Sequence, residues 1–208
     1  GLNKQELLNS LSDEIQRGYV STNSWIPEGI FGSDNSAGAA LSASEELATD
    51  YWARGLNADD ISIELLYSME NSLHVELAIA LEKLWEEKLP VQVILRSEKA
   101  EEYFADLKAG DYQFAIGGWQ ADYPHASNWL LPFASDSDNN FLSFTDEKYD
   151  LLLQAVDEAT NADEKFSKYA EAHEYLIEQS VIIPMLHPAS LALIRSEFSA
   201  AVNTMFDF

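Results

Sequence analysis

The chain has 208 residues, 47% of them hydrophobic, with 36 acidic and 12 basic residues that give a formal net charge of −24. A surface of this charge repels nucleic-acid phosphates and anionic membrane faces, which excludes nucleic-acid binding first. The chain has no cysteine and no run of about 18 apolar residues, so disulfides, thiolate nucleophiles and a membrane-spanning helix are excluded as well. The first residues do not form a basic and then apolar signal peptide, so we expect either a cytosolic chain or one whose targeting segment has been removed.

The N-terminal part predicts a helix over residues 3–16, with Asn3 placed as its N-cap. Apolar residues recur there at helical spacing, namely Leu7, Leu8, Leu11 and Ile15. Residues 25–44 lack periodicity and contain many small residues and turn formers, so we expect a loop. A second helix is expected over residues 45–55.

The central part alternates between strands and helices. The patterns predict strands at residues 61–65, 91–95 and 112–118, and helices at residues 73–88 and 99–109. Strands joined by helices in this order are typical of a parallel sheet.

The C-terminal part predicts helices over residues 146–160 and 163–179, followed by strands at residues 181–186 and 191–195 that complete the sheet layer. The expected fold class is therefore α/β, a mostly parallel central sheet with flanking helices. The length suits one large domain over residues 1–208.

The end of the predicted third strand is the main candidate for a binding site. Open parallel sheets bind ligands beyond the carboxyl ends of their strands, and Gly117 and Gly118 lack the Cβ atom that would keep another backbone at a distance. Asp122 follows, where its charge could meet a cation. A structural role remains open for Asp122, as an Asx turn or cap for the bend that follows it. For Trp119, a core position and a ligand platform remain equally open.

Other polar patterns are weaker. Asp136, Asp138, Asn140 and Glu147 fit part of a calcium-loop template, but Phe141 stands where the turn requires glycine, so an ordinary polar loop is favoured over a metal site. His173 falls on the apolar face of its helix, which predicts a core histidine. His125 and His187 have no partner at metal-ligand spacing.

No pattern for an enzyme is found: the sequence shows no nucleophile with a base, no metal cluster and no phosphate-binding glycine loop, and we expect no cofactor. Dispersed carboxylate pairs, as in glycosidases, remain the main alternative of the enzyme class. A protein-interaction module is the third class.

Several motifs, in order along nearly the whole chain, resemble one family. They are Trp25-Ile26-Pro27-Glu28-Gly29, Leu65-Leu66-Tyr67, Gly110-Asp111-Tyr112, Gly118-Trp119-Gln120-Ala121-Asp122-Tyr123, Tyr149-Asp150-Leu151-Leu152 and Ile182-Ile183-Pro184. Together they are similar to the C-terminal lobe of the oligopeptide-binding proteins of bacterial ABC importers. The resemblance implies one lobe of a two-lobed fold of the type II periplasmic-binding-protein kind, with the other lobe absent.

The resemblance also implies residue roles. Main-chain groups near Gly118, Trp119 and Gln120 would pair with an extended peptide, Asp122 would bind the peptide's α-ammonium group, and His74 would lie near the far end of the ligand. The sequence departs from close peptide binders at Ile116, where they often carry an arginine. This departure puts the capture of the carboxylate of short peptides in doubt.

By this resemblance the protein would deliver extended oligopeptides to an ABC transporter permease. It would act as a monomer in the periplasm or, as a lipid-anchored lipoprotein, on the outer face of the cytoplasmic membrane. A peptide-signal receptor, and the same fold binding a nickel chelate or an oligosaccharide, remain as alternatives.

Overall fold

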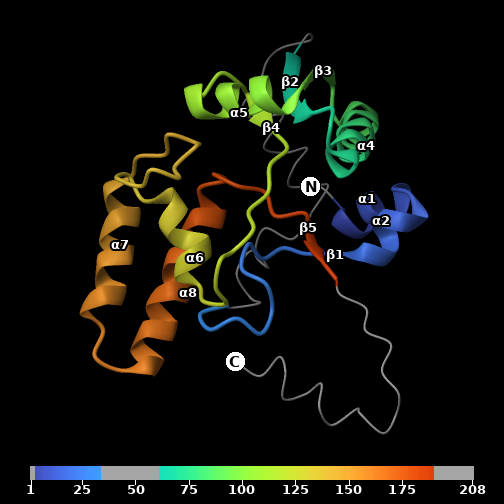
Figure 1. The fold of residues 1–208 in the computed structure, drawn as a ribbon. Coiled ribbons are helices and arrows are strands. Elements are labelled where there is room, and N and C mark those ends of the chain that lie inside the picture. The colour runs from blue at the N-terminus through green and yellow to red at the C-terminus, as the bar shows by residue number, and fades with distance from the viewer. Residues whose placement is uncertain (1–2, 34–60, 190–208) are drawn as a thin grey trace, which may run out of the picture.

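A computed structural model of the chain describes residues 3–33 and 61–189. In chain order its helices and strands are α1 (Lys4–Ser10), α2 (Asp13–Gly18), β1 (Tyr19–Ser21), β2 (Ile61–Ser68), α4 (Ser72–Lys88), β3 (Val91–Glu98), α5 (Ala100–Ala109), β4 (Phe114–Ala115), α6 (Ser127–Leu130), the 3-10 helix η1 (Leu131–Phe133), α7 (Glu147–Glu158), α8 (Ala162–Glu178) and β5 (Leu186–Pro188). Figure 1 shows two packed groups of elements, one around β2, β3 and β4 and one around α6, α7 and α8, with β1 and β5 between them.

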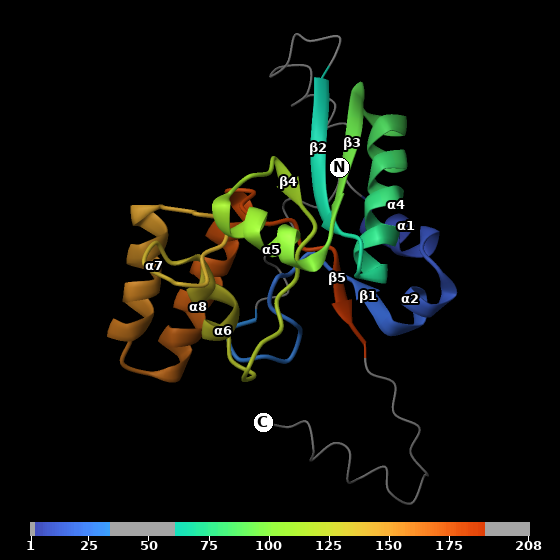
Figure 2. The same ribbon diagram turned by 45° about the horizontal axis from the view of Figure 1, so that its top comes forward.

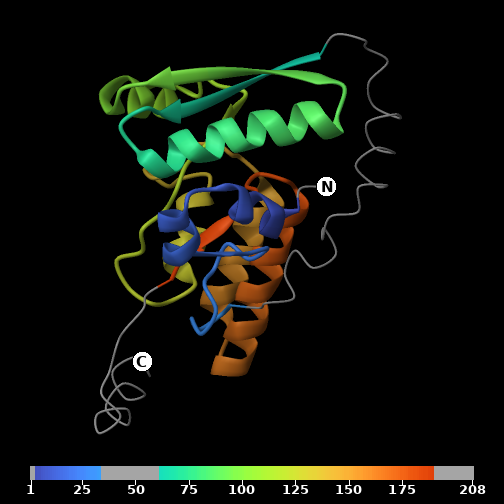
Figure 3. The ribbon, with the colours of Figure 1, turned by 90° about the vertical axis from the view of Figure 1, so that its right-hand side faces the viewer.

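The central sheet has the order β3-β2-β4, and both of its strand pairs are parallel. Helix α4 covers one face of the sheet and α5 lies on the other (Figures 2 and 3). Leu65 and Val93 pack with α4, and the next residue along β2, Leu66, is also fully buried. The predicted order of strand, helix, strand, helix and strand is confirmed.

Local signals set the ends of the two sheet-covering helices. The Asn71 side chain accepts hydrogen bonds from the main-chain N–H groups of Leu73 and His74 and so caps the start of α4. Gly110 ends α5 in the left-handed conformation, with φ of 70°, where its N–H bonds to carbonyls of the last turn. The lead-in Gly110-Asp111-Tyr112 is therefore a helix stop that turns the chain into β4.

The predicted helix over residues 3–16 is two helices rather than one. Asn3 caps α1 as expected, accepting from the N–H of Glu6, but the chain is extended at Leu11 and Ser12. The N–H of Ser12 donates to Glu76 of α4 at 2.7 Å, which fixes the break against the neighbouring helix. The predicted apolar stripe still packs together in the core beside α4.

The second group of elements has its own core. Tyr149 of α7 is fully buried and donates its hydroxyl to the carbonyl of Leu130, and burial raises the pKa of this phenol far above its usual value. His173 of α8 is also fully buried, and its Nε2 accepts from the N–H of Trp25 at 3.1 Å. The prediction of a core histidine at this position is confirmed.

Two strand predictions need correction. The third strand pairs only over Phe114–Ala115, not over residues 112–118. The segment 181–186 does not extend the central sheet; β5 begins at Leu186 and pairs antiparallel with β1 in a separate two-stranded sheet. Its Leu186 side chain packs beside the α1–α4 core, so apolar burial there did not require a place in the parallel sheet. The expected helix 45–55 and strand 191–195 lie outside the described residues.

No helix within residues 3–33 and 61–189 has the length and apolar character needed to cross a bilayer.

Candidate functional site

The chain leaves the central sheet just after β4 and carries the predicted binding segment. The N–H of Ile116 donates to the carbonyl of Leu66 at 2.9 Å, which is the last main-chain bond to the sheet. From Gly117 to Ala121, no main-chain N–H or carbonyl bonds to any other group of the described residues. Gly117, Gly118 and Gln120 are exposed. A free row of donors and acceptors therefore lies at the carboxyl end of the parallel strands.

Tyr103 of α5 holds the start of this segment. Its hydroxyl donates to the carbonyl of Ile116 at 2.6 Å, and burial, assisted by the nearby Tyr112, raises the pKa of this phenol to about 12. The His74 ring packs against the Tyr103 ring edge to face, with centroids 5.7 Å apart. His74 is thus linked to the segment through Tyr103 rather than pointing into solvent.

The His74 ring is largely desolvated. Its Nδ1 is buried and has no hydrogen-bond partner among the described residues. Burial lowers the pKa of the imidazole below its usual value, so the ring is neutral at neutral pH. A neutral ring could offer one donor and one acceptor to a ligand.

Asn128 of α6 is a residue that the sequence analysis missed. It is only 7% exposed, and its Oδ1 accepts two hydrogen bonds, from Nε1 of Trp119 at 3.0 Å and from the main-chain N–H of Asp122 at 3.3 Å. One side-chain oxygen therefore fixes both ends of residues 119–122. Neither its position in a short helix nor its residue type stands out in the sequence, because this contact depends on how the loop returns over α6.

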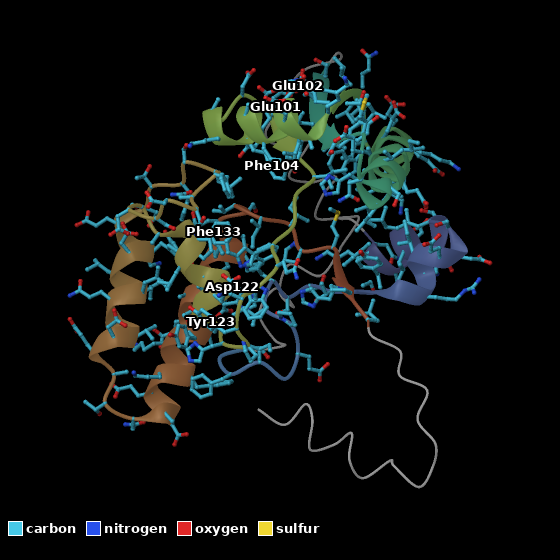
Figure 4. The ribbon with its side chains drawn as sticks, viewed as in Figure 1. Glu101, Glu102, Phe104, Asp122, Tyr123 and Phe133 are labelled. Atoms are coloured by element: carbon cyan, nitrogen blue, oxygen red, sulfur yellow. The ribbon has the colours of Figure 1, made fainter. Side chains whose placement is uncertain are left out.

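The carboxylate of Asp122 takes no part in this arrangement. Its residue is exposed, and its side chain makes no hydrogen bond or ion pair with the described residues. The bend that follows it is held instead by Asn128 and by the N–H of His125, which donates to the carbonyl of Tyr123. The alternative of a structural cap or Asx turn at Asp122 is therefore not what the structure shows. Figure 4 places Asp122 and Tyr123 beside the helices of the second group.

Of the two roles left open for Trp119, the structure shows the core position, and a role as ligand platform stays a prediction. Its ring is partly buried against the core around α6, α7 and α8, while its indole N–H is bound to Asn128. Ile116, where close peptide binders often carry arginine, is 2% exposed and belongs to the core beneath the sheet. A cation at this buried position would lose its hydration, which is costly unless it is paired.

The sequence on both sides of the segment is poor in positive charge. Between Lys108 and Lys148 the sequence contains no lysine or arginine.

Phe104, on α5 next to Tyr103, is 62% exposed, and in Figure 4 it lies on the side of α5 that faces Asp122. Its exposure could not be deduced from the helical pattern alone.

In the weak calcium-loop pattern, the Asn140 side chain stabilises the loop itself through hydrogen bonds to its main chain. Nδ2 of Asn140 donates to the carbonyls of Ala134 and Phe144, and its Oδ1 accepts from the N–H of Phe144. In the described part of the chain, no three His, Cys, Asp or Glu side chains come together in a way that could hold a metal ion.

Comparison with known proteins gives relatives for this arrangement, although no protein-family model matches the chain. It is 30% identical over 135 residues to the probable deoxycholate-binding periplasmic protein YgiS of Escherichia coli K12. The aligned residues make up 65% of this chain and 25% of YgiS. It is 28% identical over 142 residues to the periplasmic oligopeptide-binding protein OppA of Salmonella typhimurium LT2, covering 68% of this chain and 26% of OppA. The chain spans about a quarter of the length of these relatives.

The fold has counterparts among solved structures. Haemophilus influenzae OppA, in complex with the peptide RPPGFSPFR, superposes with a TM-score of 0.75 at 24% identity, over 89% of this chain and 39% of that one. The predicted fold class is confirmed by this likeness, and the resemblance to oligopeptide-binding proteins is confirmed by the sequence matches. Both curated relatives are named as binding proteins, in agreement with the prediction of a binding protein rather than an enzyme.

Proposed function

From its relationship to periplasmic oligopeptide-binding proteins, we propose that this chain is one lobe of a larger two-lobed extracytoplasmic protein and binds extended oligopeptides. Residues 1–208 form the lobe, and the rest of the ligand's contacts come from a second lobe that closes on it by a hinge motion. The protein acts as a monomer and passes its ligand to an ABC transporter permease.

The observation that carries the proposal is the free main chain of residues 117–121. An extended peptide that lies along it can pair its own N–H and carbonyl groups with those of Gly118, Trp119 and Gln120, as in the addition of a strand to a sheet. Affinity from main-chain bonds is common to all peptide sequences. Such a site therefore accepts many peptides of different composition.

The two ends of this row carry suitable partners for the ends of a peptide. The unpaired carboxylate of Asp122 binds the α-ammonium group, which fixes the direction of the peptide. His74, linked to the start of the row through Tyr103, bonds near the other end as a neutral imidazole. Position 116 offers no arginine for the peptide's carboxylate, because Ile116 lies there in the core.

The test is a binding titration, followed by NMR, of the chain with trialanine and with N-acetyl-trialanine, which lacks the α-ammonium group. We expect trialanine alone to shift the resonances of residues 117–122. Asp122→Ala should weaken trialanine binding by about 1 kcal/mol, because Asp122 is exposed in this chain and a solvated charge pair contributes little. Asp136→Ala is the matched control, an exposed aspartate on another loop. Equal binding of both peptides, or an equal loss in both variants, would refute the role of Asp122.

A non-peptide solute is the second candidate, because YgiS is named as a probable deoxycholate-binding protein. Titration with deoxycholate separates the two. Shifts caused by deoxycholate but not by trialanine would keep the fold and the site while replacing the ligand class.

A further inference from the structure

We propose that Asn128 is the positioning residue of the peptide site: it holds the binding segment in its ligand-ready shape before any ligand arrives. This inference rests on the proposed function, because it explains how an otherwise unpaired segment can bind. The segment has no main-chain bonds of its own within the described residues between Gly117 and Ala121. Something other than the sheet must therefore restrict it.

The hydrogen bonds determine the orientation of the Asn128 amide. Both the indole of Trp119 and the main chain of Asp122 are donors, so the atom they share must be the oxygen. With both donors on Oδ1, its acceptor sites are filled. The amide NH2 group has no hydrogen-bond partner among the described residues.

The position of the two bonds gives them their effect. One restrains the side chain of Trp119 and the other the main chain of Asp122, so the turn between them is closed on a single buried atom. Asn128 is itself held in place, because its neighbours Trp129 and Leu130 are part of the buried core. Without the bonds, a peptide would have to order this turn on binding, at a cost in conformational entropy that weakens its affinity.

A purely structural role for Asn128 makes a different prediction. If the residue only stabilised the fold, its loss would lower stability everywhere and leave the folded site unchanged. If it positions the segment, its loss loosens residues 119–122 in a chain that is otherwise folded. Trp25 provides the internal reference, since its indole N–H donates to the carbonyl of Trp129 at 2.8 Å and does not depend on Asn128.

The experiment compares Asn128→Leu, which has a similar volume but no acceptor, with Asn128→Asp, which keeps an acceptor oxygen. In 15N relaxation of the full 208-residue chain, we expect the Trp119 indole to become mobile in Asn128→Leu while the Trp25 indole stays rigid. Trialanine should bind about ten-fold more weakly to Asn128→Leu, and Asn128→Asp should recover most of the affinity.

Two outcomes would overturn the inference: a Trp119 indole as rigid in Asn128→Leu as in the wild type, or unchanged trialanine affinity in that variant. If Asn128→Leu does not fold, Trp119→Phe tests the same bond from its other side, because it removes the donor and keeps an aromatic ring. Failure of the proposed peptide binding can be distinguished from failure of the inference about Asn128. In that case the wild-type chain shows no shifts with trialanine, while the relaxation of the Trp119 indole still reports whether Asn128 restrains the turn.

Discussion

At the scale of single residues, Arg96 has the most concentrated set of charge contacts in the described structure. Its guanidinium bonds to the carboxylates of Glu64, Glu98 and Asp106 and to the carbonyl of Asp111, whose carboxylate is 3.5 Å away. The bond to Glu98, followed by that to Glu64, raises the pKa of Arg96 above its usual value. This one cation joins β2, β3 and α5 to the lead-in of the binding segment.

Removal of Arg96 is therefore expected to destabilise the fold. Arg96→Met leaves four carboxylates facing one another at a partly solvated site, and we expect a loss of about 1–3 kcal/mol in the free energy of unfolding. Urea denaturation measures it. Arg96→Lys should lose less, because it keeps the charge, and added salt should recover part of the loss in Arg96→Met by screening the carboxylates. A Met variant as stable as the wild type would show that these contacts contribute nothing net.

His74 gives a prediction for pH. Its folded-state pKa is lowered by burial, so the unfolded chain binds a proton more readily than the folded chain does. The stabilisation from its neutral ring is present above the unfolded pKa of about 6.5 and is lost as the pH falls through the lower folded value. Compared with His74→Phe, which keeps a ring against Tyr103, the wild type should lose stability as the pH falls below about 6.5. A pH-independent difference between the two unfolding free energies would contradict this.

At the scale of elements, Gly32 lies where the loop that follows β1 packs closely against Tyr169 of α8. Its φ is +87°, and a Cβ there would lie 2.6 Å from the Cβ of Ala126 and 3.0 Å from that of Tyr169. Gly110 has a similar φ of +70° but open space around it. Alanine substitutions at the two glycines therefore allow the loss of stability from a strained backbone to be separated from the loss caused by steric overlap.

We expect Gly110→Ala to cost about 1 kcal/mol, from backbone strain alone, and Gly32→Ala clearly more, since strain and overpacking add. Urea denaturation of both variants measures the difference. Equal losses would mean that the loop can move away from α8 at little cost.

The elements also show what the sequence could and could not predict. The strands and helices from Ile61 to Ala109 were predictable, because each has a clear period and a local stop signal such as Pro90 or Gly110. The short length of β4 was not, because the alternation of residues continues past Ala115, where the pairing stops although β2 itself runs on to Ser68. For the candidate site, the motif predicts roles for Asp122 and Trp119, which stay predictions. Asn128 was not predicted, since a residue that acts across a turn leaves no periodic signal.

At the scale of the whole molecule, the net charge of −24 and the stretch without lysine or arginine predict a bias among ligands. Lys-Ala-Lys should bind more tightly than Glu-Ala-Glu, and the difference should shrink as salt increases, because exposed charges are screened over about 10 Å at 0.1 M ionic strength. Titrations at two salt concentrations measure this. Salt-independent discrimination would indicate specific side-chain pockets instead of the general field.

We also expect the isolated chain to bind peptides far more weakly than the two-lobed protein of which we propose it is a part. Half of the contacts and the exclusion of water are missing from one lobe. Dissociation constants for the same peptide with both proteins test this. Comparable values would mean that the site is complete within this chain.

The free main-chain groups of residues 117–121 have a further consequence for handling the protein. An unpaired backbone edge can join to that of a second molecule and start aggregation, and natural proteins often prevent this with charge. Here the repulsion between highly acidic copies supplies that protection. Near the isoelectric point of about 4.2 the repulsion disappears. The same row of amides and carbonyls that we propose receives a peptide would then be the place where self-association begins, and a bound peptide would block it.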